Sequence, residues 1–321
     1  MFHDIVFKVP SRYTIDPASV SFTKKILVIT GPTAVGKSAL LRDVKPHMDG
    51  PFISADSRQI YKEMRIGTAK PDPEEIAALD IKLVDQVSIH EHYHAGRYER
   101  EALALILPAL EDGQIPVVSG GTGLYIKAIA EGLDDIPAVD PSVIQQLNQV
   151  AEEQMRSLVE ELKQKDPQYH MRIDLSNRHR VLRALGVIRQ TGQAYSSFIG
   201  KVKPRPFEVK YVILERTREA LYERINERVL QMMEAGLMRE AESLFTHRKL
   251  KALQTVGYTE LFRHMEGELS LDEAVSEMQK NTRRYAKRQM TWFRNQVKAD
   301  FIHPDDKESL SNQITRIKES Q

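Results

Sequence analysis

Residues 31–38 are the stretch of this chain whose residue types and spacing point most directly to chemistry. They read Gly-Pro-Thr-Ala-Val-Gly-Lys-Ser and fit G-x-x-x-x-G-K-[ST], the phosphate-binding P-loop pattern. Gly31 and Gly36 let the backbone curl so that successive N–H groups face one anion. Lys37 adds a full positive charge, and the Ser38 hydroxyl can ligate Mg²⁺. The pattern predicts a polyphosphate site without saying which polyphosphate binds.

The flanking residues predict the two elements that such a loop needs. Residues 25–29 read as a buried strand, and residues 39–41 continue as a helix whose N-terminus adds partial positive charge at the loop. A chance glycine-rich turn is the alternative, but it explains neither flank.

Asp56 is a second chemical candidate, because it directly follows the next predicted strand, residues 51–55. Ligands of parallel α/β sheets bind beyond the carboxyl ends of the strands, so Asp56 is expected on the same rim as the P-loop. Its alternative role is the N-cap of a helix that starts at Ser57, since aspartate oxygens accept backbone N–H groups. Both roles are open from the sequence.

A third predicted strand, residues 115–119, ends in another glycine-rich turn, Gly120-Gly121-Thr122-Gly123, which opens a helix at Leu124. This turn is expected on the same rim of the sheet. No aspartate ends the strand, although a Walker-B metal site would need one.

His90, His92 and His94 alternate along the chain, so on an extended segment they would share one face, as metal ligands can. No carboxylate stands at a companion spacing, and a helix is predicted directly afterwards over residues 95–107. Exposed loop histidines are the alternative, and we assign no metal to this stretch.

Residues 137–203 differ in character from the rest of the chain. They are polar, helical in pattern and punctuated by prolines, with no strand signal. We interpret them as a helical subdomain inserted into a discontinuous catalytic core, residues 25–136 and 204–300. Arg180 and Arg183 share a helix face there, and either phosphate contact or a solvated surface would account for them.

Basic residues recur in two later predicted helices. Arg224 and Arg228 stack one turn apart on the first. Residues 280–298 hold seven Lys or Arg and no acidic residue, with Tyr285 and Trp292 expected on a separate face. The positions expected on one basic face are 280, 284, 287, 294 and 298. A basic stripe flanked by aromatic residues suits a phosphate backbone, and a solvated helix surface is the alternative.

The whole-chain composition sets limits on the function. The 321 residues carry a net charge of only +1, so nucleic-acid binding would need a local patch. The absence of cysteine excludes disulfides, thiolate zinc sites and cysteine nucleophiles. No stretch approaches a membrane span, and residues 1–24 lack the apolar run of a signal peptide. We expect a cytoplasmic monomer with an N-terminal extension at 1–24 and a polar, loosely held tail at 301–321.

Together these motifs resemble one family, the tRNA dimethylallyltransferases, also called tRNA isopentenyltransferases. The matching segments span Ile26 to Gln296 in the family's order: GPTAVGKS, ADSRQIYKEMRIGTAKP, SGGTGLYIKAI, HRVLRAL, LYERINERV, TVGYTEL and KRQMTWFRNQ. The resemblance implies an α/β fold, with a P-loop NTPase-like parallel sheet core, an inserted all-helical subdomain and a C-terminal basic helix. It implies transfer of a dimethylallyl group from dimethylallyl diphosphate to N6 of the adenosine just 3′ of the anticodon, in tRNAs that read codons beginning with U. The implied partners are the tRNA anticodon stem-loop and dimethylallyl diphosphate, whose diphosphate takes the P-loop in place of ATP, and the implied cofactor is Mg²⁺.

The resemblance also assigns roles to residues. Asp56 corresponds to the general base, Thr122 to a threonine that approaches the target nucleotide, and Arg224 to an arginine that contacts the donor diphosphate. The rest of the diphosphate site is expected at Gly31, Thr33, Ala34, Val35, Gly36, Lys37 and Ser38, with Ser38 also holding the metal. Contacts with tRNA are expected from Asp56, Ser57, Arg58, Gln59, His179, Arg180, Arg183, Gln254, Gly257, Tyr258, Lys287, Arg288, Gln289, Trp292 and Arg294.

Two positions depart from the family pattern. Ile144 stands where many members carry an arginine that contacts tRNA, and Gly186 stands where the family has a glutamate. Both fall in the insertion, so they bear on contact with the anticodon arm and not on the chemistry.

Two other functions remain open from the residues. A P-loop kinase of a nucleotide or small metabolite would explain residues 31–38 but would leave the basic stretches without a role. A non-catalytic RNA-binding protein with a relic P-loop would explain the basic stretches, but not why Lys37, Ser38 and Asp56 are all intact.

Overall fold

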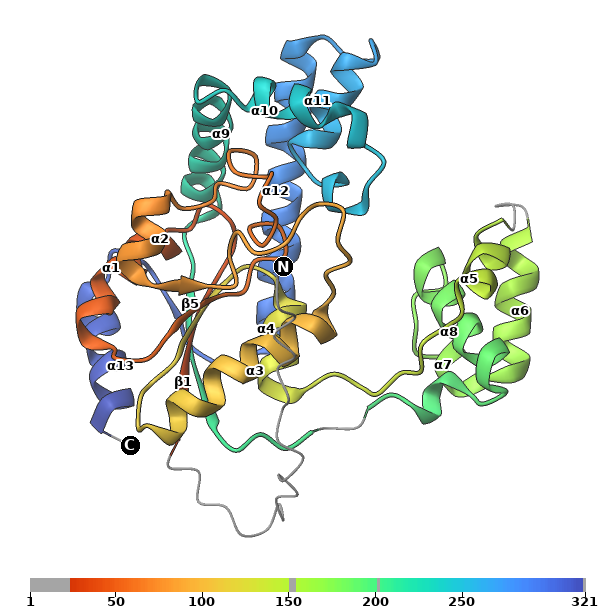
Figure 1. Cartoon of the computed structure of the whole chain (residues 1–321), viewed down its shortest axis with the longest axis horizontal. Coiled ribbons are helices and arrows are strands. Elements are labelled where there is room, and N and C mark those ends of the chain that lie inside the picture. Colours follow the sequence, from red (N-terminus) through yellow and green to blue (C-terminus); the bar gives the residue numbers. More distant parts are fainter. Residues whose placement is uncertain (1–23, 150–153, 201–202, 320–321) are drawn as a thin grey trace, which may run out of the picture. The chain divides into compact units, whose positions relative to one another are not determined.

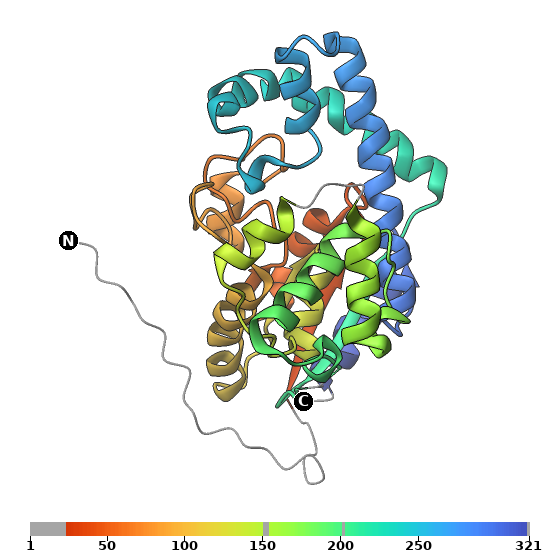
Figure 2. The same cartoon turned by 90° about the vertical axis from the view of Figure 1, so that its right-hand side faces the viewer.

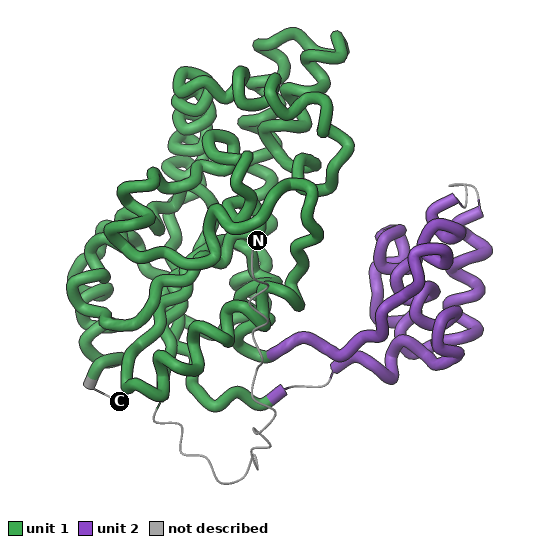
Figure 3. Tube along the Cα trace, in the orientation of Figure 1, with its two compact units in different colours: residues 1–131, 204–321 green, residues 132–203 purple. Residues whose placement is uncertain are grey.

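The computed structural model of the chain describes residues 24–149, 154–200 and 203–319, so the predicted N-terminal extension lies almost wholly outside the described residues. The described residues fall into two compact units (Figure 3). One lies within Met1–Glu131 and Pro204–Gln321, and the other within Gly132–Lys203. None of the described helices is both long and apolar enough to cross a membrane.

The first unit is built on a six-stranded parallel sheet with the strand order β3-β2-β4-β1-β5-β6. The central strand β1 is buried along its whole length, as the apolar run of residues 26–29 predicts for a strand covered on both faces. The strands are β1 (Lys25–Thr30), β2 (Phe52–Ser54), β3 (Ile81–Lys82), β4 (Val117–Gly120), β5 (Glu208–Leu214) and β6 (Phe301–Ile302).

Helices cover both faces of this sheet (Figure 1). Alternate residues of β1 point to opposite faces, so Ile26 and Val28 join one apolar core while Leu27 and Ile29 join another. The first core includes helices α3 (Ala95–Glu111) and α4 (Gly123–Glu131), and the second includes α1 (Lys37–Val44), α2 (Pro73–Leu79) and α13 (Lys307–Glu319).

Three further helices of this unit lie around a fourth, α12, which is its longest element. They are α9 (Arg218–Glu234), α10 (Leu237–Leu244), α11 (Tyr258–Met265) and the 26-residue α12 (Leu271–Gln296). Ser270 and Glu273 form a capping box that begins α12. Figures 1 and 2 show α12 running from the layer of α10 and α11 down to the sheet, where it reaches α4.

The second unit is all-helical and has its own apolar core. Its helices are α5 (Pro141–Asn148), α6 (Met155–Lys165), α7 (Pro167–His170) and α8 (Arg178–Thr191). Gly186 of α8 is buried, and a Cβ there would lie 3.3 Å from Val139 Cγ1. A glutamate at this position would have to displace Val139, so glycine suits the packing of this unit.

The C-terminal tail differs from the expectation of a loosely held polar segment. Residues 301–302 form β6 and pair with β5, and α13 buries Leu310, Ile314 and Ile317. These three apolar residues recur at helical spacing, and their stripe covers one face of the sheet. The composition of residues 301–321 is polar on average, so it does not reveal this stripe.

Candidate active site

The loop between β1 and α1, residues 31–36, curls so that the side chain of Lys37 contacts its backbone. Lys37 Nζ donates to the carbonyl oxygens of Gly31 at 3.0 Å and Pro32 at 2.8 Å. Gly36 and Ala34 adopt left-handed backbone angles, φ 119° and 63°, which the tight curl requires. Ser38 is exposed in the first turn of α1. The predicted P-loop is therefore present, at the carboxyl end of the central strand.

Three arginines lie against successive residues of this loop. Their bonds are Arg216 Nε to Val35 O at 3.0 Å, Arg224 Nε to Ala34 O at 2.9 Å and Arg228 to Thr33 Oγ1 at 3.4 Å. Arg224 and Arg228 come from successive turns of α9, so their shared face brings both to the loop. The family resemblance implies a role for Arg224 alone, whereas the one-turn spacing already indicates Arg228 as well.

The charges in this cluster act on one another. Burial lowers the pKa of Lys37 to about 8, the carboxylate of Asp56 opposes this shift, and Arg228 adds to it. Burial also lowers the pKa of Arg228, again opposed by Asp56. At pH 7 Lys37 therefore remains mostly charged, and one carboxylate faces a group of cations that suits an anionic ligand.

Asp56 follows β2 and caps the turn after it. Its Oδ1 accepts the backbone N–H groups of Arg58 at 2.8 Å and Gln59 at 3.3 Å. The predicted helix is absent at Ser57, which lies within the described residues 24–149, so Asp56 caps a turn and not a helix. This capping does not exclude a chemical role. A carboxylate has two oxygens, and within the described residues no hydrogen bond is formed by Oδ2.

Thr122 ties the ends of two strands together. Its Oγ1 accepts the backbone N–H of Ser57 at 3.0 Å and donates to Ser57 Oγ at 3.3 Å. Its own N–H donates to Ala55 O at 3.1 Å. Thr122, Ser57 and Asp56 therefore lie together on the rim, as the sequence analysis expects.

Arg58 and Gln59 hold neighbouring loops in place. The Arg58 guanidinium donates to the carbonyls of Lys251, Ala252 and Gln254, which brings the predicted tRNA-contact segments 56–59 and 254–258 together. Gln59 donates to Thr68 O and Ala69 O.

Tyr258 is a correction among the predicted tRNA contacts. Its side chain is completely buried, and its hydroxyl donates to Glu240 at 2.6 Å. Gly257 beside it is buried as well, whereas Gln254 is exposed. Tyr258 therefore supports the fold of this segment.

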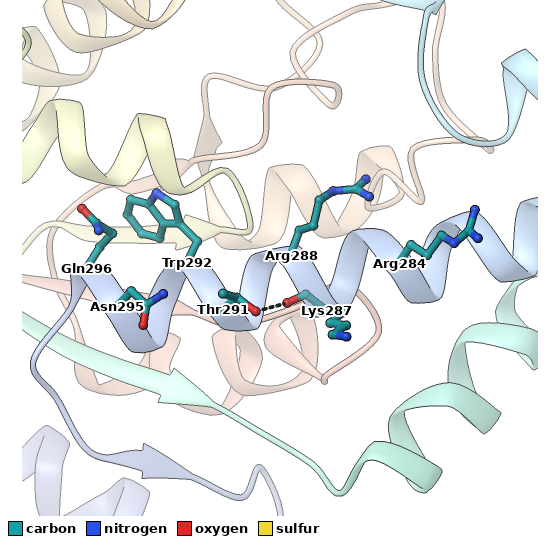
Figure 4. A pocket seen from close by; sticks show the side chains of 7 residues that line it. All are labelled: Arg284, Lys287, Arg288, Thr291, Trp292, Asn295 and Gln296. Atoms are coloured by element: carbon teal, nitrogen blue, oxygen red, sulfur yellow. Dashed lines mark hydrogen bonds between the residues drawn. The ribbon is translucent and has the colours of Figure 1, made fainter. Parts of the chain in front are cut away.

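The exposed side of α12 carries the basic groove, which has a volume of about 550 Å³. Figure 4 shows Arg284, Arg288 and Trp292 projecting along it. The lining residues are Arg284, Lys287, Arg288, Thr291, Trp292, Asn295 and Gln296. Trp292 thus shares the basic side, contrary to the expectation of a separate aromatic face.

Three basic residues expected on that face do not line the groove: Lys280, Arg294 and Lys298. Lys280 pairs with Glu277. Lys298 follows the end of α12 at Gln296. Arg294 turns toward Glu215, with 3.1 Å between nitrogen and oxygen, and its guanidinium lies over the Phe301 ring. Arg294 is exposed but does not line the groove, and the tRNA contact expected from it stays a prediction.

Gln289 is a further correction, because its side chain is only 7% exposed. Its Oε1 accepts the N–H of Thr33 at 2.9 Å, and its Nε2 donates to Gly121 O at 2.8 Å. The amide of Gln289 is thus bonded to both glycine-rich loops and is buried away from the surface.

Tyr285, on the same helix, was not assigned to the site. It is 37% exposed, and its ring lies 5.8 Å from the Arg288 guanidinium. Burial of its hydroxyl raises the pKa of Tyr285 to about 12, and the carboxylate of Asp56 adds to the rise. Tyr285 therefore belongs to the surroundings of Asp56.

Three predicted tRNA contacts, His179, Arg180 and Arg183, are exposed on α8 of the second unit. Their role stays a prediction. Of the alternating histidines, His94 caps α3 by accepting from Arg97 N–H at 3.2 Å, and the His90 ring packs on that of His247. Within residues 24–149, 154–200 and 203–319, no group of three histidine or acidic residues could hold a metal ion.

Comparisons with known proteins agree on one family. A family model described as IPP transferase matches residues 59–296. A curated relative from Christiangramia forsetii, named tRNA dimethylallyltransferase, is 44% identical over 88% of this chain and 94% of its own. Another, tRNA dimethylallyltransferase 1 from Bacteroides fragilis, is 39% identical over 92% and 99%. The crystal structure of tRNA delta(2)-isopentenylpyrophosphate transferase from Staphylococcus epidermidis is 29% identical, covers 93% of this chain and 100% of its own, and superposes with a TM-score of 0.66.

Proposed function

The chain belongs to the IPP transferase family, and we propose that it is a tRNA dimethylallyltransferase that transfers a dimethylallyl group from dimethylallyl diphosphate to N6 of the adenosine 3′ of the anticodon. We further propose that its substrates are tRNAs reading codons that begin with U, and that it acts in the cytoplasm as a monomer. The observation that carries the chemistry is the sheet rim, where the P-loop after β1 and Asp56 after β2 lie at the same edge of the parallel sheet.

The donor end of the reaction needs positive charge where the diphosphate leaves. As the bond between the allylic carbon and oxygen breaks, negative charge grows on the leaving oxygens. The P-loop N–H groups, Lys37, Arg224 and Arg228 would stabilise that charge, since these side chains are already fixed against the loop. Preorganised cations need little rearrangement at the moment of reaction.

The residues present fit a magnesium ion only in company with the donor. Ser38 offers one exposed hydroxyl at the start of α1, and the described residues provide no cluster of carboxylates. Mg²⁺ is commonly held by few protein oxygens, together with substrate phosphates and water. When bound, it would neutralise charge on the diphosphate.

The acceptor end needs a base, because the exocyclic nitrogen of adenine must lose a proton as the new N–C bond forms. We assign this role to Asp56, whose carboxylate can orient N6 and accept the proton. Thr122, tied to Ser57 beside it, would approach the target nucleotide. Alignment of two bound substrates should then account for much of the rate.

The tRNA would be bound by its backbone and read in a single-stranded loop. Arg284, Lys287 and Arg288 present cations along the groove of α12, and Trp292 offers a ring for stacking. We assign backbone contacts also to Arg180 and Arg183 of the second unit. The target adenosine is stacked in its loop, so it must be flipped out to reach Asp56.

Nucleoside analysis tests the proposed activity. Unmodified tRNA is incubated with the protein, Mg²⁺ and dimethylallyl diphosphate, then digested and examined by mass spectrometry. We expect N6-dimethylallyladenosine, located 3′ of the anticodon when fragments are mapped. A tRNA that stays unmodified, or a label on another nucleoside, would contradict the assignment.

The groove of α12 yields a prediction about salt. Replacing Arg284 and Arg288 together with Ala should weaken tRNA binding. It should also reduce the slope of log affinity against log salt concentration by about 1–2, because fewer counterions are released when fewer phosphates are contacted. Binding is measured by filter retention at several salt concentrations. The matched control replaces Arg42, which is exposed, and Lys82, which is half-buried, two cations outside the groove. An unchanged slope in the groove variant would show that these residues contact no phosphate and form only a solvated surface.

The lowered pKa of Lys37 yields a prediction about pH. In the free protein Lys37 is mostly charged below pH 8 and mostly neutral above it. Because an anion binds the charged form better, affinity for dimethylallyl diphosphate should fall by up to about tenfold per pH unit above pH 8. Calorimetry without tRNA measures this affinity and the accompanying uptake of a proton. In Lys37→Arg the guanidinium stays charged, so the affinity should no longer fall above pH 8. A fall that persists in this variant would exclude Lys37 as its cause.

A further inference from the structure

We infer that Gln289 is a positioning residue that fixes the donor loop and the acceptor turn relative to each other. The inference rests on the proposed function and adds a residue that determines alignment and does not touch either substrate. Its basis is the pair of hydrogen bonds that one buried amide makes to two loops, each of which serves a different substrate.

The donor side of this contact lies on the P-loop. Gln289 Oε1 accepts the N–H of Thr33, the residue whose hydroxyl also meets Arg228. A shift of Gln289 would therefore move both the backbone of the phosphate loop and its contact with a cation of α9.

The acceptor side of this contact lies on the second glycine-rich turn. Gln289 Nε2 donates to the carbonyl of Gly121, directly before Thr122, which in turn holds Ser57 beside Asp56. The two loops are far apart in sequence, and each relies on the same side chain from α12 for a hydrogen bond.

The fit around the amide is too close for it to be a loose surface contact. A Cβ on Gly121 would lie 2.3 Å from Gln289 Nε2, and a Cβ on Gly123 would lie 2.5 Å from the Trp292 ring. Both glycines thus allow α12 to approach the turn. A displacement of about 1 Å between reacting groups can lower the rate about 10²-fold. The relative position of the two loops, which Gln289 fixes, therefore bears directly on catalysis.

The position of Gln289 on α12 also links it to the groove. Arg288 precedes it, and Trp292 follows within one helical turn on the exposed side (Figure 4). A tRNA seated in the groove therefore lies on the helix that aligns the two loops, although Gln289 itself is buried.

The first test compares single-turnover rates at saturating concentrations of both substrates. Gln289→Leu should lower the rate about 10–100-fold, while Kd for tRNA and for dimethylallyl diphosphate stays within about threefold of wild type. The matched control is Gln279→Leu, also on α12. It removes the hydrogen bond from the Gln279 amide to Asn226 O of α9 and should leave the rate unchanged.

The second test is a double-mutant cycle between the two residues in contact. Gly121→Ala should slow transfer in the wild type, because its Cβ displaces the Gln289 amide, but should add little in the Gln289→Ala background, where that space is free. Strong non-additivity supports positioning. Independent effects that multiply would overturn it, as would a normal rate in Gln289→Leu. A loss of rate that is matched by loss of folded protein would show a merely structural role and would also overturn the inference.

The wild-type protein separates this inference from the proposed function. If wild type transfers no dimethylallyl group to tRNA, both are overturned. If wild type is active and Gln289→Leu is equally active, only the positioning role fails.

Discussion

Asp56→Asn is expected to lower the rate of dimethylallyl transfer by about 10²–10⁴-fold, the usual contribution of a positioned base. Asparagine keeps a side-chain oxygen for the N–H groups of Arg58 and Gln59, which Asp56 Oδ1 now accepts. The substitution therefore removes the base but preserves the cap. Single-turnover assays with tRNA and dimethylallyl diphosphate measure the rate, and filter binding should show nearly unchanged affinity for tRNA.

Asp306→Asn is a suitable control for this variant, because Asp306 likewise caps a backbone N–H, that of Ser309, but lies at the start of α13. It should transfer at the wild-type rate. A near-normal rate in Asp56→Asn would leave Asp56 with its capping role alone, and the base would have to be sought elsewhere.

Lys37→Ala should reduce single-turnover transfer by about 10²–10³-fold, in the range observed when one preorganised donor is removed from a site of developing negative charge. Arg224→Ala should have a smaller effect, because the Arg224 side chain is exposed and its charge is screened by solvent. In both variants tRNA affinity should survive, since the two side chains lie against the P-loop and not in the groove of α12.

The control for these variants is Lys62→Ala, which removes an exposed lysine outside the P-loop. It should leave both binding and transfer unchanged. Equal losses of tRNA binding and donor use in Lys37→Ala would indicate general damage, and full activity would exclude the P-loop as the diphosphate site.

Much of the fold and the rim could be predicted from sequence because the signals are local. A buried strand, a glycine-rich loop and a helix stand next to one another at residues 25–41, and their order fixes where Lys37 and Ser38 lie. Asp56 and Thr122 were predicted on the same rim because both follow parallel strands, whose carboxyl ends share one edge.

The parts that could not be predicted depend on contacts between distant residues. Gln289 stands 256 residues from Thr33, and nothing local shows that it is buried between two loops. The side of α12 that Trp292 faces is likewise decided by close packing on Gly123. The order of the tail could not be predicted for another reason: Leu310, Ile314 and Ile317 form an apolar stripe that the polar composition of the tail conceals.

The most direct test of the central claim compares two labelled donors in parallel. One carries label in the dimethylallyl group of dimethylallyl diphosphate and the other in the γ-phosphate of ATP, and each is assayed with and without unmodified tRNA. We expect label from the allylic donor to enter tRNA, with release of diphosphate only when tRNA and Mg²⁺ are present, and no phosphoryl transfer from ATP to any acceptor. Transfer of the ATP label to a small molecule, with no allylic label in tRNA, would contradict the account and identify the P-loop as that of a kinase.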